Sequence, residues 1–223
     1  MVSRLIAGAA VGAAAVVAYR RWVKPWQERW GATEAEIESP LPGDEHVPEP
    51  ATQRTRAISI DASPEDVWPW VVQIGADRGG FYSYDWLENL FGLKIHSAGQ
   101  IVDAWQDLRV GEIVAADRRR SGGWAVAELE PGEVLALILA DVSTGRAVTR
   151  DEGMRWEFLW TFAVQPGPEG GTRLLVRERT GFGSSLGKIV MAPVDLVSFA
   201  MTRRMLIGIR SRAETSAEFQ IGA

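Results

Sequence analysis

Side chains that could act as acids, bases or hydrogen-bond donors gather around the pair Gly79-Gly80: Arg78 precedes it, and Tyr82, Tyr84 and Asp85 follow. Because two glycines give the backbone unusual freedom, Arg78 and Tyr82 could form a lid over a cavity, with Asp85 orienting Arg78. The same residue types also fit a structural role, in which Asp85 caps a helix, Arg78 pairs with it and the tyrosines pack. We take Arg78, Tyr82, Tyr84 and Asp85 as candidate ligand-binding residues.

Glu178 is a further candidate, in a run that alternates apolar and polar residues. If Leu174 and Val176 point into the protein, alternation along a strand points Glu178 inward as well. Because a buried carboxylate needs a partner or a raised pKa, Glu178 is predicted to hydrogen-bond a ligand or to pair with Arg78 at a cavity mouth. The alternative is that the strand ends there and Glu178 is solvated.

Large apolar side chains recur at every second position of residues 154–164. One face of a predicted strand therefore carries Met154, Trp156, Phe158, Trp160 and Phe162. Trp156 and Trp160 would line a flat apolar pocket and offer indole N–H donors to an oxygenated ligand, or would simply fill the core. Met201, on the apolar face of a predicted C-terminal helix, completes the candidate binding residues.

The composition excludes several kinds of chemistry. The 223 residues include no cysteine and only two histidines, so thiolate nucleophiles, disulfides and zinc sites built from cysteines or several histidines are ruled out. A net charge of -5 argues against binding the nucleic-acid backbone, which needs a basic face. No nucleophile elbow, phosphate loop or dinucleotide fingerprint occurs. We therefore expect no metal, no cofactor and no nucleic-acid partner.

The elements that position these candidates follow from the hydrophobic pattern. Residues 56–61 alternate as a strand, and Ser63 with Pro64 begins a helix that ends at Gly75. Strands are predicted at 112–116, 123–129, 133–140, 154–164 and 172–180, with turn residues such as Pro131-Gly132 between them. Because consecutive strands joined by short turns form an antiparallel sheet, the predicted fold class is α+β.

Two further helices are predicted. A short one, from Ser83 to Gly92, would bury the apolar residues Trp86, Leu87, Leu90 and Phe91. A long one runs from Pro193 to about Ser216 and presents an apolar face. These helices and strands make up a main domain predicted to span residues 54–216, followed by a tail at 217–223.

The first 30 residues differ from the rest. Residues 5–19 carry no charge and are mostly Ala, Gly and Val, enough for a helix of about 22 Å against a bilayer core of roughly 30 Å. The adjacent Arg20 and Arg21 and nearby tryptophans suit a membrane interface, although a cleaved signal peptide or a disordered arm also fits. We expect residues 1–30 to form an apolar helix that inserts through residues 5–23 as a single-pass anchor, with the main domain cytoplasmic.

Residues 31–53 carry six acidic residues, four prolines and no Lys or Arg. Proline disfavours helices and central strands, and like charges repel one another along the chain. This stretch is therefore predicted to be an extended linker between the anchor and the main domain.

Three motifs resemble those of the START-like SRPBCC superfamily, which includes polyketide cyclase/dehydrase and lipid-transport-like proteins, and are similar to an actinobacterial branch of it. They are Val72-Gln73-Ile74-Gly75, the run from Arg78 to Asn89, and residues 199–214, which read FAMTRRMLIGIRSRAE. The resemblance covers residues 54–216. It implies a helix-grip fold, in which a curved antiparallel sheet wraps around the long C-terminal helix and leaves a cavity for an apolar ligand between them.

The expected function is the binding or transfer of an apolar small molecule or lipid in an internal cavity, by a domain tethered at the membrane. The alternative is a polyketide cyclase or dehydratase type of enzyme acting on an oxygenated apolar substrate. Its acid and base would come from Asp85, Glu178, His96 and the hydroxyls of Tyr82 and Tyr84. A third possibility is an interaction domain whose cavity is filled by its own side chains.

Overall fold

Seven strands form one curved antiparallel sheet in the computed structural model, which describes residues 12, 14–90, 92–148, 156–182 and 185–221. The strands are β1 (Thr52–Ile60), β2 (Ile113–Ala115), β3 (Gly123–Glu130), β4 (Val134–Asp141), β5 (Arg146–Ala147), β6 (Trp156–Pro166) and β7 (Thr172–Phe182). Their order across the sheet is β1-β7-β6-β4-β3-β2, and β5 pairs with β4. A register shift between Val126 and Glu128 in β3 adds a local bend.

The antiparallel sheet predicted from the alternating pattern is confirmed. Each strand predicted after residue 100 lies within a few residues of its predicted position, and among the described residues the two-residue strand β5 is the one that the sequence did not predict. The turn between β3 and β4 contains Pro131-Gly132, as the sequence indicates, and Gly132 has a φ of +87°, which glycine adopts without strain. Turn chemistry and period-two alternation together therefore explain most of the sheet.

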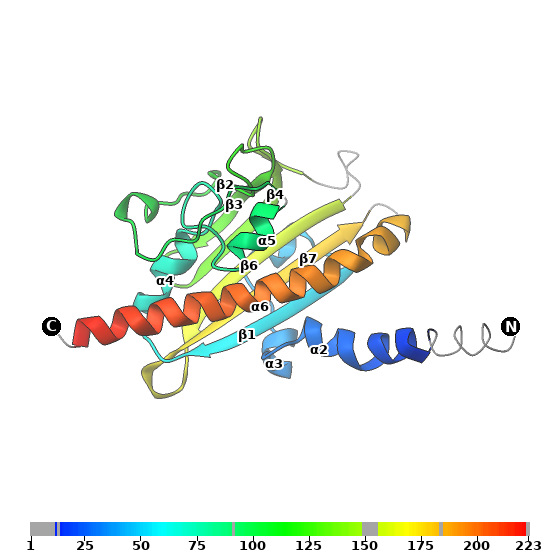
Figure 1. Ribbon diagram of the computed structural model, residues 1–223, viewed down its shortest axis with the longest axis horizontal. Coiled ribbons are helices and arrows are strands. Elements are labelled where there is room, and N and C mark those ends of the chain that lie inside the picture. The colour runs from blue at the N-terminus through cyan, green and yellow to red at the C-terminus, as the bar shows by residue number, and fades with distance from the viewer. Residues whose placement is uncertain (1–11, 13, 91, 149–155, 183–184, 222–223) are drawn as a thin grey trace, which may run out of the picture.

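Two helices cover one face of the sheet. Helix α6 (Ser185–Ile221) runs along the strands, and α4 (Pro64–Val72) packs against it (Figure 1). The predicted start of α4 is confirmed: the Ser63 hydroxyl accepts a hydrogen bond from the Asp66 N–H at 3.3 Å, and Pro64 lies in the first turn. The long C-terminal helix is also confirmed, although it begins at Ser185 rather than at Pro193.

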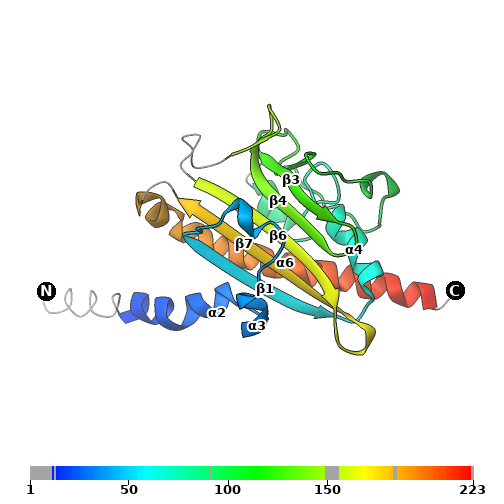
Figure 2. The ribbon, with the colours of Figure 1, turned by 180° about the vertical axis from the view of Figure 1, so that it is seen from behind.

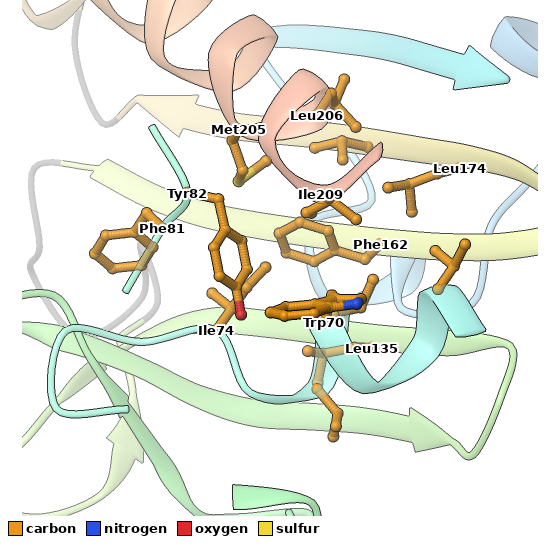
Figure 3. Close-up of a cluster of buried hydrophobic side chains, with 14 of the residues drawn as sticks. Trp70, Ile74, Phe81, Tyr82, Leu135, Phe162, Leu174, Met205, Leu206 and Ile209 are labelled. Atoms are coloured by element: carbon orange, nitrogen blue, oxygen red, sulfur yellow. The ribbon is translucent and has the colours of Figure 1, made fainter. Parts of the chain in front are cut away.

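The hydrophobic core lies between these two helices and the sheet (Figure 3). Trp70 of α4, Phe162 of β6, and Leu206 and Ile209 of α6 are all buried. Truncating a buried aromatic residue of this kind to alanine costs about 3–5 kcal/mol. The core therefore holds this part of α6 at a fixed distance from the sheet.

The N-terminal segment departs from its prediction. Among the described residues, no helix combines enough length and apolar character to cross a membrane, so the single-pass anchor with a cytoplasmic main domain is wrong. Residues 1–11 and 13 of the predicted apolar helix lie outside the described residues. The described part includes a π-helical turn (Tyr19–Val23) that carries Arg20 and Arg21 and continues into α2 (Lys24–Glu28).

The end of this segment makes tertiary contacts with the rest of the domain. The ring of Trp26 lies 5.3 Å from that of Phe199 on α6, in an edge-on arrangement. Gln27 is buried, and its carbonyl accepts a hydrogen bond from Arg56 Nε at 2.9 Å. Trp30 lies under the guanidinium of Arg203 at 5.2 Å. These residues contact the folded domain, although Trp26 stays 55% exposed and Trp22 67% exposed.

Residues 31–53 are folded rather than extended, so that part of the linker prediction is wrong. Helix α3 (Glu34–Glu38) begins with a capping box between Thr33 and Glu36, and a short 3₁₀ helix follows at Asp44–His46. The segment lies on the face of the sheet opposite α6, seen from behind in Figure 2. Two of its acidic residues, Glu36 and Asp44, pair with arginines of β7 there, which reduces the repulsion that would have kept the chain extended.

Candidate ligand-binding cavity

A cavity of about 300 Å³ lies between the sheet, α6 and the short helix α5 (Asp85–Leu90). Its aromatic lining comes from Phe81, Trp124, Phe158 and Trp160. Helix α6 contributes Ser198, Met201, Thr202 and Met205. Strand β7 contributes Glu178 and α5 contributes Glu88. The cavity is therefore largely apolar and contains two carboxyl groups.

Three of the aromatic residues form one cluster along the wall. The ring centroids of Trp124 and Trp160 are 5.4 Å apart, and Phe81 lies 6.1 Å and 6.2 Å from them. The indole nitrogens of both tryptophans are buried and have no hydrogen-bond partner within the described part of the protein. Because buried indole N–H groups usually find an acceptor, the wall has unused donor capacity.

Glu178 faces this cavity and is fully buried, so it is not a solvated residue at a strand end. Its partner is Arg56 of β1 rather than Arg78: Arg56 Nη1 donates to Glu178 Oε1 at 2.8 Å. The hydroxyl of Thr202 donates to the same oxygen at 2.8 Å, and Ser198 Oγ lies 3.3 Å from Oε2. Arg54, directly across in the β1–β7 register, adds a second positive charge with an N···O distance of 3.9 Å.

The charge state of Glu178 follows from these contacts. Burial alone raises the pKa of its carboxyl group, but the charges of Arg56 and Arg54 and the Thr202 hydrogen bond outweigh burial and hold the pKa below its usual range. Glu178 is therefore an ionised group whose two oxygens are already occupied. Whether it also contacts a ligand stays a prediction.

Glu88 is the second carboxyl group of the cavity, and sequence analysis missed it. It is buried, and its Oε1 accepts a hydrogen bond from the Ser83 hydroxyl. Its Oε2 is buried and has no hydrogen-bond partner within the described residues. Burial raises the pKa of Glu88, and the nearby charge of Asp85 acts in the same direction. Unlike Glu178, Glu88 is in surroundings that favour the neutral acid.

The orientation of α5 explains why Glu88 was missed. The apolar pattern predicts that Trp86 and Leu90 are buried, yet they are 68% and 74% exposed; Phe91 lies outside the described residues. Polar contacts turn the helix: the Asn89 side chain bonds both the N–H and the carbonyl of Ile95, at 2.7 and 2.9 Å. A helix of six residues has too short an apolar stripe to overrule such contacts.

Arg78 and Tyr82 are not a lid. The Arg78 guanidinium donates to the carbonyl of Trp105, and burial lowers its pKa. Tyr82 lies in the core (Figure 3), where its hydroxyl accepts a hydrogen bond from Gln73 Nε2 at 3.0 Å and burial raises its pKa. Gly80 has a φ of +73°, and a β-carbon there would lie 2.8 Å from Ser97 Cα, so this glycine serves close packing.

Tyr84 and Asp85 border a different hollow, of about 760 Å³, on the protein surface. Asp85 accepts hydrogen bonds from the N–H and hydroxyl of Ser97, at 2.8 and 2.6 Å. The guanidinium of Arg204 lies 6.0 Å from the ring centre of Tyr84. These contacts match the structural alternative better than a ligand-orienting role.

Some of the remaining candidate residues line the cavity and others do not. Trp160 and Met201 line the cavity, whereas Trp156 is absent from its lining and packs beside Phe158, with ring centroids 6.3 Å apart. Met154 lies outside the described residues. The structure thus brings Trp160, Glu178 and Met201 to one cavity, and places Arg78, Tyr82, Tyr84, Asp85 and Trp156 elsewhere.

One group of side chains could hold a metal ion. Within the described residues, ligand atoms of Glu45, His46 and Glu128 all lie within 4.8 Å of one another. Sequence reasoning counted only cysteines and histidines and did not consider such a mixed set. None of the three lines the cavity, and exposed acidic groups often gather without a metal, so the cluster does not define a site.

No protein-family model and no curated protein matches this sequence. Among solved structures, protein CV1439 from Chromobacterium violaceum is 15% identical, with a TM-score of 0.42 over 73% of this chain and 96% of that one. A protein from Arthrobacter aurescens is 16% identical, with a TM-score of 0.41 over 80% and 92% of the two chains.

DynU16, from the dynemicin biosynthetic locus, is 14% identical, with a TM-score of 0.38 over 70% of this chain and 46% of that one. Likeness at this level assigns neither a family nor a function to this chain.

Proposed function

We propose that this protein binds an apolar small molecule in the cavity between the sheet and α6. The observation that carries the proposal is the cavity itself: about 300 Å³ of space walled mainly by aromatic and aliphatic side chains. This volume is at the lower end of the range for small-molecule sites, which favours a compact ligand over a lipid with two acyl chains. Each Å² of apolar ligand surface that is removed from water contributes about 25 cal/mol to the favourable free energy of binding.

The arrangement of elements supports this function. A curved antiparallel sheet with a long C-terminal helix along one face resembles the helix-grip fold of START-like SRPBCC proteins, whose cavity lies between the same two elements. The open space also argues against the interaction domain considered from the sequence, because in that case side chains would fill the cavity. The motifs at residues 72–75, 78–89 and 199–214 point to the same superfamily.

An enzyme of the cyclase or dehydratase type is the second candidate. It is favoured by the presence of two carboxyl groups in one cavity whose pKa values move in opposite directions, upward for Glu88 and downward for Glu178. However, a carboxylate with a lowered pKa is a weak base, and both oxygens of Glu178 already accept hydrogen bonds. Binding therefore accounts for more of the geometry than catalysis does.

A substitution that fills the cavity tests the proposed function. Tetralin, a compact bicyclic hydrocarbon, serves as the probe, and its dissociation constant is measured by ligand-observed NMR on the full chain. Met201→Trp places a larger side chain in the cavity and is expected to weaken binding at least tenfold. The matched control is Leu196→Trp on the same helix, where residue 196 is 53% exposed and binding should be unchanged.

Two outcomes would contradict the proposed function. One is that tetralin shows no saturable binding to the wild-type protein. The other is that Met201→Trp and Leu196→Trp bind tetralin equally well while both variants remain folded by circular dichroism, because binding would then occur outside the cavity.

A further inference from the structure

Some polar atoms of the residues that line the cavity have hydrogen-bond partners and others have none. Glu178, Thr202 and Ser198 bond to one another, and Glu178 also bonds to Arg56. Ser83 donates its hydroxyl to Glu88 Oε1. The buried polar atoms left without a partner in lining residues are Glu88 Oε2 and the indole nitrogens of Trp124 and Trp160. Unsatisfied buried polar atoms cost about 1–3 kcal/mol each, so a ligand that pairs with one of them gains affinity.

These three atoms share one hydrogen-bonding character. An indole nitrogen can only donate. A carboxyl group donates through its O–H when neutral and only accepts when ionised. The Ser83 hydroxyl already serves one oxygen of Glu88, which leaves Oε2 as the place for the acidic proton. With Glu88 neutral, all three atoms are donors that lack an acceptor.

The groups around Glu88 favour this neutral form. Asp85 lies on the same helix, with His96 against it at 3.7 Å, and Glu178 is across the cavity on β7. The lining residues within the described part of the chain include no Lys, Arg or His. Arg56 and Arg54 pair with Glu178, and Arg204 lies over the ring of Tyr84 beside the separate surface hollow. Ionised Glu88 would therefore be a buried anion without a counter-ion.

We propose that Glu88, as the neutral acid, donates a hydrogen bond from Oε2 to a carbonyl oxygen of an uncharged apolar ligand. This inference rests on the proposed function and names the ligand class of the same cavity. A ligand carboxylate would enter without a cation to pair with, and an ammonium group would bring only donors and leave the indole nitrogens unpaired. The cavity should thus select ketones or related carbonyl compounds over hydrocarbons, acids and amines of the same shape.

A matched set of probes tests the assignment: tetralin, α-tetralone, tetralin carboxylate and α-aminotetralin share one bicyclic skeleton. Dissociation constants are measured by ligand-observed NMR on the full chain at about pH 6. One buried hydrogen bond predicts that α-tetralone binds about five- to tenfold more tightly than tetralin. The carboxylate and the amine should bind more weakly than α-tetralone.

Two variants and the pH dependence separate hydrogen bonding from packing. In Glu88→Leu the preference for α-tetralone over tetralin should disappear while tetralin still binds. In Glu88→Gln the amide N–H remains a donor at every pH, so the preference should persist. In the wild-type protein it should decline as pH rises through the raised pKa of Glu88 and the carboxyl group loses its proton. If the Leu variant does not fold, the Gln variant and the pH series still give the answer.

The outcomes distinguish the inference from the function on which it rests. Equal binding of tetralin and α-tetralone to the wild-type protein would overturn the role of Glu88 and leave cavity binding intact. Tightest binding of the amine or the carboxylate would overturn the assigned ligand class. Failure of tetralin and α-tetralone alike to bind would overturn the proposed function, and the inference with it.

Discussion

Charged residues on the two faces of the sheet differ in how they are paired. On the face opposite α6, the arginines of β7 are matched to acceptors: Arg173 Nε donates to Glu36 at 2.6 Å, Arg177 Nη1 to Asp44 at 2.7 Å, and Arg179 Nη1 to Gln53 at 2.6 Å. Backbone carbonyls of the segment 31–53 accept several of their remaining N–H groups.

On the face toward α6, Glu178 is matched in the same manner, but Glu88 and the indoles of Trp124 and Trp160 are not. Space also remains there, about 300 Å³. Unpaired buried polar atoms occur on both faces, since Asp44 Oδ1 and Thr161 Oγ1 also lack a partner within the described residues. Those of Glu88, Trp124 and Trp160 differ in that they belong to residues lining open space, where a bound molecule could pair with them. This difference supports the proposal that the cavity toward α6 binds a ligand, while the ion pairs on the other face stabilise the protein.

The largest expected effect is the loss of the Glu178 carboxylate. Glu178→Ala leaves the Arg56 guanidinium buried without its charge partner, which should lower the free energy of unfolding by about 3–5 kcal/mol. Urea denaturation measures this. The double variant Glu178→Leu with Arg56→Met should recover much of the loss, because no charge is then left buried. A loss below about 1 kcal/mol in the single variant would show that the pair is solvated.

A smaller loss is expected on the opposite face. Arg177→Met removes the ion pair with Asp44 and hydrogen bonds to the carbonyls of Ser39 and Glu36, and should cost about 2–3 kcal/mol, since Asp44 retains partial access to water. Tetralin binding to the folded variant should be unchanged. A weakened dissociation constant in this variant, measured by NMR, would break the functional division between the two faces.

The smallest expected effect concerns stability: the contributions of Glu88 and Glu36 to the free energy of unfolding should change with pH in opposite directions. The pKa of Glu88 is raised by burial, so its folded state holds the proton longer than the unfolded chain, and stability falls as pH rises above about 4.5. The pKa of Glu36 is lowered, chiefly by the hydrogen bond from Arg173, so its contribution is present above about 4.5 and is lost as pH falls through the lowered value.

Comparing each glutamate with its Gln variant by urea denaturation across the pH range isolates these contributions. Glu88→Gln should gain stability relative to wild type as pH rises. Glu36→Gln should lose about 0.5–1 kcal/mol at neutral pH and approach wild type in acid. The same sign of pH dependence for both residues would contradict the contrast between the faces.

Sequence patterns revealed the sheet and one of the cavity carboxyls, because both depend on local alternation. Glu178 points inward since it shares a face with Leu174 and Val176. Its partner Arg56 could not be assigned in this way, because the pairing of β1 with β7 joins residues more than a hundred positions apart. Alternation shows which face a residue takes but not which strand lies beside it.

The errors have related causes. Glu88 was missed because side-chain bonds from Asn89 to a later loop, rather than an apolar stripe, orient α5. The segment 31–53 looked extended because its acidic residues were counted without the arginines of β7 that pair with Glu36 and Asp44. In each case a polar contact outweighed a local pattern: one six residues away for α5, and one more than a hundred residues away for the segment 31–53.

The most direct measurement is a crystal structure of the full chain with α-tetralone bound. The expected result is density for the bicyclic skeleton against Trp124 and Trp160, with the carbonyl oxygen within hydrogen-bonding distance of Glu88 Oε2. Density only in the surface hollow beside Tyr84 and Asp85, with the cavity closed by its own side chains, would contradict the assignment of the binding site to the face under α6.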